Sequence, residues 1–233
     1  MQASELFKQS NTVLLDGGMG TMLQAAGLPA GGLPEIYNIE HPEIVREIHS
    51  AYVQAGSDVV TANTFQANEL KLKDCGYAPE ELISAGVRLA KESGAKYTAL
   101  DIGPLGQLMK PMGTLTFDEA YAMFKRQIAA GAAAGADILL FETMSDLLEV
   151  KAGVLAAKET CSLPVFVTMT YQEDGRTFVG CDPRSAALTL SGLGVDALGV
   201  NCSLGPKELA PVVDELPVSY THLRAHETLR HLV

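Results

Sequence analysis

Short apolar runs alternate along the chain with longer segments in which apolar residues recur at helical spacing. The runs predict strands at 13–15, 58–63, 96–101, 138–141, 164–169 and 197–200. The segments between them predict helices at about 42–55, 79–93, 117–134, 146–159, 183–193 and 206–216. This alternation predicts six strand–helix units, in which parallel strands are joined by helical crossovers.

Polar residues mark the ends of the predicted strands. The strands themselves are apolar and lack a period of two, as expected when both faces are covered. A doubly wound open sheet would spread the strand ends along an edge, whereas a (β/α)₈ TIM barrel gathers them around one mouth. We expect the barrel, an α/β fold, because a polar group lies at or just past the end of each strand: Asp16, Asn63, Asp101, Glu142, Thr170 and the pair Asn201–Cys202.

The composition fits one globular domain and excludes several classes of partner. The 233 residues are 47% hydrophobic and 19% charged, which is typical of a chain with one substantial core. The net charge of −11 argues against nucleic acid and anionic membranes as partners, because both attract basic proteins. No run is apolar enough to span a membrane, and no signal peptide is evident. The four cysteines lack a disulfide pattern, so we expect a cytoplasmic protein.

Two strand ends carry carboxylates that can do chemistry. In Asp16-Gly17-Gly18 the carboxylate can hold an ammonium group and the backbone amides can approach a ligand, although a tight turn also explains the glycines. Glu142 directly follows an apolar strand, where an ionised carboxylate needs a partner. That partner is either a substrate cation or a buried basic residue.

The strand end at 201–202 offers an amide and a thiol. Cys202 can be a metal ligand, a nucleophile or a small core residue. Asn201, like Asn63 at an earlier strand end, can bind a substrate carboxylate or cap a loop.

Four motifs, in this order, resemble the homocysteine S-methyltransferase family. They are L-L-D-G-G-M-G-T-M-L-Q, the block E-H-P-E-I-V-R-E-I-H-S-A-Y-V-Q-A-G-S-D-V-V-T-A-N-T-F, L-L-F-E-T, and G-V-N-C-S-L-G-P. The resemblance runs from about Val13 to Val218 and is closest to the homocysteine-binding module of cobalamin-dependent methionine synthase. It implies a (β/α)₈ barrel and methyl transfer to homocysteine, giving methionine.

The resemblance also implies roles for individual residues. Asp16 and Glu142 match the acidic residues that hold the homocysteine amino group, and they are the expected catalytic pair. The backbone amide of Gly17 would bind the substrate carboxylate. Asn63 and Asn201 would line the same mouth.

Cys202 matches the first of the family's three zinc-binding cysteines. Zinc held by thiolates would take the homocysteine sulfur and lower its pKa. That sulfur would attack a methyl group carried on cobalamin by another module, so methylcobalamin and cobalamin- and folate-binding modules are expected in the parent protein. The other two zinc ligands belong to a G-G-C-C-G-T motif, and no Cys-Cys pair occurs in this sequence. We therefore expect a barrel truncated after about six βα units, with poor zinc binding and little activity.

The last residues depart from the pattern. Residues 219–233 carry three of the five histidines of the chain and one acidic residue, Glu227. We interpret 1–218 as the incomplete barrel domain and 219–233 as a non-family, artefactual tail that resembles read-through into a sequencing adapter. We expect this tail to be frayed or weakly helical.

Other functions stay open at this point. S-methylmethionine or a betaine-like compound is an alternative methyl donor. A non-catalytic fragment that self-associates through unpaired strand edges is the alternative outside enzymes. A lyase that acts through Glu142 and Asp16 would lack a strand-end lysine for a Schiff base.

Overall fold

The computed structural model describes residues 12–216 and the backbone of 224–226. The strands are β1 (Val59–Thr61), β2 (Tyr97–Ile102), β3 (Ile138–Met144), β4 (Val165–Met169), β5 (Ala197–Val200) and β6 (Arg224–His226). The longer helices are α4 (Pro42–Gln54), α5 (Pro79–Glu92), α6 (Phe117–Ala133), α7 (Leu147–Thr160), α8 (Pro183–Gly192) and α9 (Pro206–Glu215). Shorter helices, α2 (Met19–Ala25), η1 (Pro34–Ile36) and α3 (Tyr37–Glu40), precede them.

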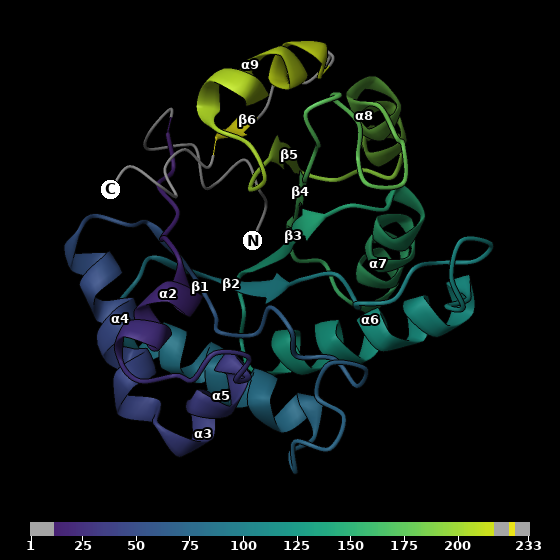
Figure 1. Cartoon of the computed structure of the whole chain (residues 1–233). Coiled ribbons are helices and arrows are strands. Elements are labelled where there is room, and N and C mark those ends of the chain that lie inside the picture. Colours follow the sequence, from purple (N-terminus) through teal and green to yellow (C-terminus); the bar gives the residue numbers. More distant parts are fainter. Residues whose placement is uncertain (1–11, 217–223, 227–233) are drawn as a thin grey trace.

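The strands form one parallel sheet in the order β1-β2-β3-β4-β5-β6, which is also their order in the chain. Because β–α–β crossovers are right-handed, an order without reversal places every connecting helix on the same face of the sheet. In Figure 1 the strands accordingly curve around the centre of the molecule, and α4 to α9 lie outside them. The described part of the chain therefore has the barrel arrangement, and the doubly wound alternative is excluded.

Each face of the sheet buries its own apolar cluster. The outer cluster joins the sheet to the helices, for example through Leu100 of β2, Phe141 of β3 and Phe124 of α6. The inner cluster collects residues from β1 to β5: Val59, Ala99, Ile138, Leu140, Phe166 and Ala197. Side chains of a strand alternate between faces, so these apolar strands supply both clusters at once.

Local signals explain why the helices begin where the sequence predicts. Proline occupies the first turn of α4, α5, α8 and α9, where its missing N–H is not needed. Thr116 opens α6 with a capping box, in which its hydroxyl accepts the amide N–H of Glu119. Asp146 and Asp182 are the N-caps of α7 and α8, and their carboxylates accept the backbone amides of Leu148 and Ser185.

The N-terminal segment differs from the sequence prediction. The strand expected at 13–15 is reduced to one parallel bridge between Leu15 and Val59 of β1. The segment after it forms α2, a helix that the sequence analysis did not predict. These short elements depend on tertiary packing, since Leu23 of α2 is buried against the α4 residues Val45 and Ile48.

The tail prediction is tested at three residues. Arg224–His226 form β6, which pairs in parallel with β5. For these residues the expected frayed or weakly helical end is wrong, because the edge of β5 offers unpaired backbone groups to an extended segment. Residues 217–223 and 227–233 lie outside the described residues, so the domain boundary at 218 stays a prediction.

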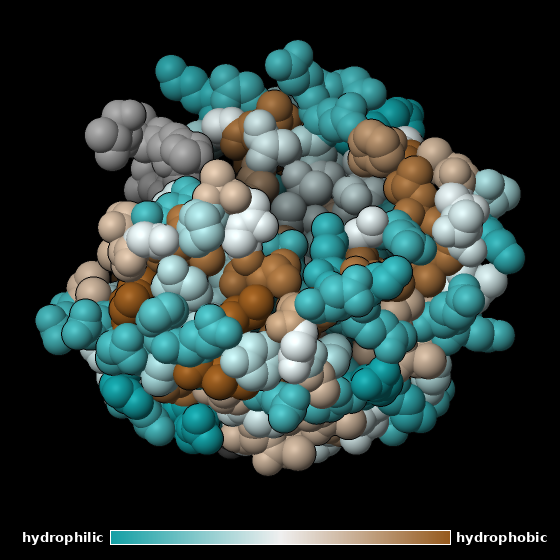
Figure 2. Space-filling view, turned by 60° about the horizontal axis from the view of Figure 1, so that its bottom comes forward, coloured by the Kyte–Doolittle hydropathy of each residue, from teal (hydrophilic) through white to brown (hydrophobic). Residues whose placement is uncertain are grey.

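The surface mixes hydrophilic and hydrophobic side chains (Figure 2). On the face shown in Figure 2, hydrophilic side chains cover most of the surface, and hydrophobic patches appear between them. Across the described residues, every helix is too short or too polar to cross a membrane.

Two glycines let helices pack closely on the outer face of the sheet. A Cβ at Gly153 of α7 would lie 2.4 Å from Cε1 of Phe141, and one at Gly131 of α6 would lie 2.4 Å from Cδ2 of Leu100. Phe141 and Leu100 are both fully buried, so neither the Phe141 ring nor the Leu100 side chain has room to move away from an added Cβ. Each helix can therefore lie this close to the sheet only because glycine has no side chain.

We predict that Gly153→Ala lowers the free energy of unfolding by about 1–3 kcal/mol, because it overpacks the core at Phe141. Urea unfolding followed by circular dichroism measures the change. Gly192→Ala is the matched control, since a Cβ there meets nothing within 4 Å. The control should stay within about 1 kcal/mol of the unchanged protein. Equal effects of the two substitutions would contradict the packing argument.

Candidate functional site

A cavity of about 330 Å³ opens at the carboxyl ends of the strands. This volume is within the usual range of small-molecule sites. The lining residues come from the loops after several strands and from the N-terminal segment. They are Gly17, Met19, Gly20, Pro34, Glu35, Thr61, Ala62, Asn63, Thr64, Phe65, Gln66, Asp101, Glu142, Thr143 and Cys202.

The polar wall of the cavity and the inner apolar cluster lie on the same face of the sheet. Ala99 of β2 and Leu140 of β3 belong to the inner apolar cluster. Two residues further along the same strands, on the same face, stand Asp101 and Glu142. The apolar cluster thus fills the lower part of the interior, and carboxylates lie above it at the mouth.

An irregularity in β3 brings two consecutive residues to the cavity. The register between β3 and β4 shifts between Phe141 and Met144. Neighbouring residues of a regular strand face opposite sides, yet Glu142 and Thr143 both line the cavity. Thr143 has a φ of 59°, which is unusual for a β-branched residue.

Cys202 lies two residues after the end of β5 and forms one corner of the cavity. Its thiol is exposed and lies 3.6 Å from the Thr143 hydroxyl. Cys202 and Ser203 have φ values of 59° and 54°, so three strained residues meet at this corner with Thr143. Asn201 holds the corner together: its Nδ2 donates to Thr143 Oγ1 at 2.8 Å and approaches Cys202 Sγ at 3.5 Å. Backbone strain of this kind is frequent at functional sites.

Four residues expected at the site line the cavity: Gly17, Asn63, Glu142 and Cys202. Asp16 and Asn201 are absent from its lining. The Asp16 carboxylate accepts hydrogen bonds from the Thr61 backbone amide at 3.0 Å and from the Thr61 hydroxyl at 2.9 Å, which fixes the last residue of β1. Asn201 is fully buried beneath Cys202. The substrate-binding roles of Asp16 and Asn201 stay predictions.

Two of the lining residues also have structural partners. A Cβ at Gly17 would lie 2.9 Å from the Tyr52 ring, so glycine is needed there for packing as well. The Asn63 amide donates to Pro34 O at 2.7 Å and to Asn38 Oδ1 at 2.9 Å. Asn38 in turn donates to Asn63 O at 2.8 Å. Both Asn63 N–H groups are therefore engaged within the protein, which leaves its Oδ1 for a ligand.

Glu35 is a lining residue that the sequence analysis did not identify. It belongs to η1, is fully buried, and accepts the Gln66 amide on Oε1 at 2.7 Å. Burial raises its pKa above the ordinary value, and the hydrogen bond from Gln66 partly opposes this shift. The sequence Leu33-Pro34-Glu35-Ile36 contains the signal that could have identified Glu35. An acidic residue among apolar neighbours costs free energy when it is buried, unless it has a partner.

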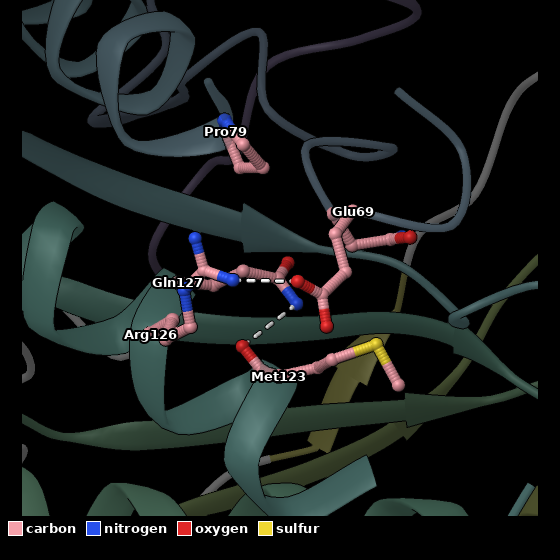
Figure 3. Close-up of a pocket in the computed structure, with 6 residues that line it drawn as sticks. Glu69, Pro79, Met123, Arg126 and Gln127 are labelled. Carbon is pink, nitrogen blue, oxygen red and sulfur yellow. Dashed lines mark hydrogen bonds and ion pairs between the residues drawn. The ribbon is translucent and has the colours of Figure 1, made fainter. Parts of the chain in front are cut away.

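A second cavity, between α5 and α6, is too small for a substrate. Its volume is about 10 Å³, which is room for one water molecule. Figure 3 shows Glu69, Pro79, Met123, Arg126 and Gln127 around it, with Arg126 paired to Glu69 and Gln127 bonded to Met123 O. The larger cavity is therefore the candidate site.

Comparison with known proteins identifies the family. The profile described as homocysteine S-methyltransferase matches residues 13–231. The chain belongs to the homocysteine S-methyltransferase family. The matched range also reaches into the segment 219–233 that we had placed outside the family pattern.

Curated relatives of this homocysteine S-methyltransferase family member include two methionine synthases. Those of Mycobacterium tuberculosis and Mycobacterium leprae are each 32% identical over an alignment of 216 residues, and the match covers 84% of this chain. The matched region is 18% of the length of each relative.

Solved structures agree with the barrel arrangement. The homocysteine methyltransferase MmuM from Escherichia coli in its metallated form superposes with a TM-score of 0.78 at 24% identity. The match covers 88% of this chain and 78% of that one. At this identity the likeness supports the fold, an α/β barrel of parallel strands.

The described residues do not fit the zinc site that the family implies. No group of three His, Cys, Asp or Glu side chains able to hold a metal occurs within 12–216. Besides Cys202, the described cysteines are Cys75, Cys161 and Cys181, which are half-buried and do not line the cavity. A catalytic zinc needs three protein ligands, and Cys202 is the one cysteine among the described residues that line the cavity.

We predict that Thr143→Val lowers the free energy of unfolding by about 1–3 kcal/mol, because the buried Asn201 amide loses its hydroxyl acceptor. Thr143→Ser is the control: it keeps the hydroxyl and removes the β-branch, so it should stay within about 1 kcal/mol of the unchanged protein. Urea unfolding of both variants measures the difference. A serine variant as unstable as the valine variant would show that the hydrogen bond is not what matters here.

Proposed function

We propose that this chain is the homocysteine-binding domain of a methionine synthase-type methyltransferase. One observation carries the proposal: strand ends far apart in the sequence bring Gly17, Asn63, Glu142 and Cys202 to one cavity. These residues combine a carboxylate for an ammonium group with a thiol for a sulfur site. The family membership and the methionine synthase relatives support the same assignment.

In this proposal, the residues of the chain bind and orient the amino acid. The Glu142 carboxylate receives the substrate ammonium group, and the Gly17 backbone faces the substrate carboxylate. Asp16 also fixes Thr61 in the cavity wall, through the bonds described above, and its contact with the substrate ammonium group stays a prediction. Cys202 marks the end of the cavity at which the homocysteine sulfur would lie.

Zinc and cobalamin belong to the proposal only for the intact enzyme. Zinc would supply Lewis acidity toward the homocysteine sulfur. The methyl group would come from methylcobalamin, presented by another module, and a folate-binding module would be a further partner. We favour this donor over S-methylmethionine or a betaine-like compound because the relatives at 32% identity are methionine synthases. A reducing, cytoplasmic compartment suits a site built on a free thiol.

Because residues 12–216 offer no second and third zinc ligand, we propose that this chain binds substrate but turns over little or none. The described residues provide the amino-acid part of the site, and Cys202 alone cannot complete the metal part.

We predict that the purified chain binds L-homocysteine and L-methionine, and that Glu142→Gln weakens both about tenfold or more. The loss follows from removing a charged hydrogen-bond partner of the substrate ammonium group. Isothermal titration calorimetry gives the affinities. Glu119→Gln, at the exposed start of α6, is the control and should bind like the unchanged chain. Absence of binding by the unchanged chain would overturn the proposed function.

We predict that zinc remains well below one equivalent in the purified chain, and that Cys202→Ser leaves it unchanged. Metal analysis with and without homocysteine tests this. Near-stoichiometric zinc that disappears in Cys202→Ser would show that other residues complete the site and would refute the proposed inactivity.

A further inference from the structure

Glu35 is a buried acid in the cavity wall that the proposed function does not yet use. Its Oε1 accepts the Gln66 amide, while its Oε2 has no hydrogen-bond partner among the described residues. The residue is 0% exposed and lines the cavity. A buried carboxyl oxygen without a partner costs free energy, so its retention points to a partner that arrives with a ligand.

The surroundings hold Glu35 in place before any ligand binds. Pro34 O, next to Glu35, accepts the Asn63 amide at 2.7 Å, and Asn38 exchanges two hydrogen bonds with Asn63. Asn38 also donates to Leu82 O of α5 at 3.0 Å. The segment carrying Glu35 is thus tied to the loop after β1 and to α5, which pre-organises its carboxyl group.

The acidic side chains of the cavity lining indicate the sign of the charge on the ligand group that would bind Oε2. The titratable groups that line the cavity with Glu35 are Asp101, Glu142 and Cys202, and the lining contains no Lys, Arg or His from the described residues. An anionic group placed beside Glu35 would face a lining whose acidic side chains, Asp101 and Glu142, are not balanced by a basic one. A cationic group would be attracted, so the partner of Oε2 is a cation rather than an anion.

We propose that Glu35 is a specificity-determining binding residue, whose Oε2 accepts a hydrogen bond from the ammonium group of the bound amino acid. This rests on the proposed function and adds to Glu142 a second carboxyl group for the same substrate cation. It assigns to η1, an element outside the barrel strands, a direct part in substrate selection.

The proposal predicts that ligand binding changes the protonation of the Glu35 carboxyl. Burial raises the Glu35 pKa in the empty site, and a bound ammonium group favours the ionised form. Binding of the ammonium group therefore lowers the pKa of the Glu35 carboxyl, and at a pH between the pKa values of the empty and the occupied site the carboxyl releases a proton to the solvent. The ammonium group keeps its own protons and its charge.

The test measures this proton release with a ligand that has no thiol. L-Methionine is titrated into the metal-free chain by calorimetry, in two buffers with different ionisation heats, at weakly acidic to neutral pH. We expect proton release by the unchanged chain, and its loss in Glu35→Gln together with an affinity decrease of about tenfold or more. N-acetyl-L-methionine, which lacks the ammonium group, should bind weakly to the unchanged chain and lose little further affinity in the variant.

Glu149→Gln is the matched control. Glu149 is also a buried glutamate, accepts the Leu105 amide at 2.7 Å, and has its pKa raised to about 7 by burial, but it lies outside the cavity lining. The control variant should release protons on methionine binding as the unchanged chain does. If proton release disappeared in Glu149→Gln and persisted in Glu35→Gln, the assignment would be wrong.

A spectroscopic readout keeps the proposal testable if Glu35→Gln does not fold. Infrared difference spectra of the unchanged chain should show the carbonyl stretch of a protonated carboxyl disappearing when methionine binds, and Glu149→Gln should show the same loss. No such loss, or wild-type binding and proton release in a folded Glu35→Gln, would overturn the role of Glu35. Failure of the unchanged chain to bind either methionine or homocysteine would instead overturn the proposed function.

Discussion

The inner face of the parallel sheet is the surface on which the candidate site depends. Val59, Ile138, Leu140 and Phe166 point from neighbouring strands into one apolar cluster. Each such side chain contributes about 1.5–3 kcal/mol when it is fully buried. Because the same face continues toward the strand ends, packing of this cluster also sets the positions of Thr61, Asp101 and Glu142 above it. The cavity is therefore a continuation of the core. Its polar side chains are held in place because they project from the same strands as the packed apolar cluster.

The corner at Cys202 shows strain held in place by hydrogen bonds. Three of the four non-glycine residues with positive φ in the described chain are Thr143, Cys202 and Ser203. Conformations of this kind cost on the order of 1–3 kcal/mol each. Asn201 offsets part of this cost through its bond to Thr143, and the Thr170 hydroxyl donates to Ser203 Oγ at 2.9 Å. The exposed thiol thus has a defined position even though it lies on a loop.

Two buried glutamates have opposite relations to the site. Glu149 and Glu35 each accept one backbone amide, and burial raises the pKa of both. Glu149 caps the loop at Leu105 away from the cavity, where a neutral carboxyl is a sufficient structural group. Glu35 lines a cavity that also contains Asp101 and Glu142, and in our proposal its titration is coupled to the binding of a cationic ligand group. Burial alone does not separate these cases; the position of the carboxyl relative to the cavity does.

The sequence by itself determined the elements from β1 to α9 and the strand ends that carry Glu142 and Cys202. It could do so because hydrophobic periodicity, prolines and capping residues act within a few residues of one another. Only the tertiary structure decided how these groups are used. Thr61 engages Asp16, Pro34 and Asn38 engage the Asn63 amide, and Gln66 holds Glu35 at the cavity. Each of these partners lies more than 20 residues away along the chain, and pairing over such distances is set by the packing of the whole barrel rather than by local pattern.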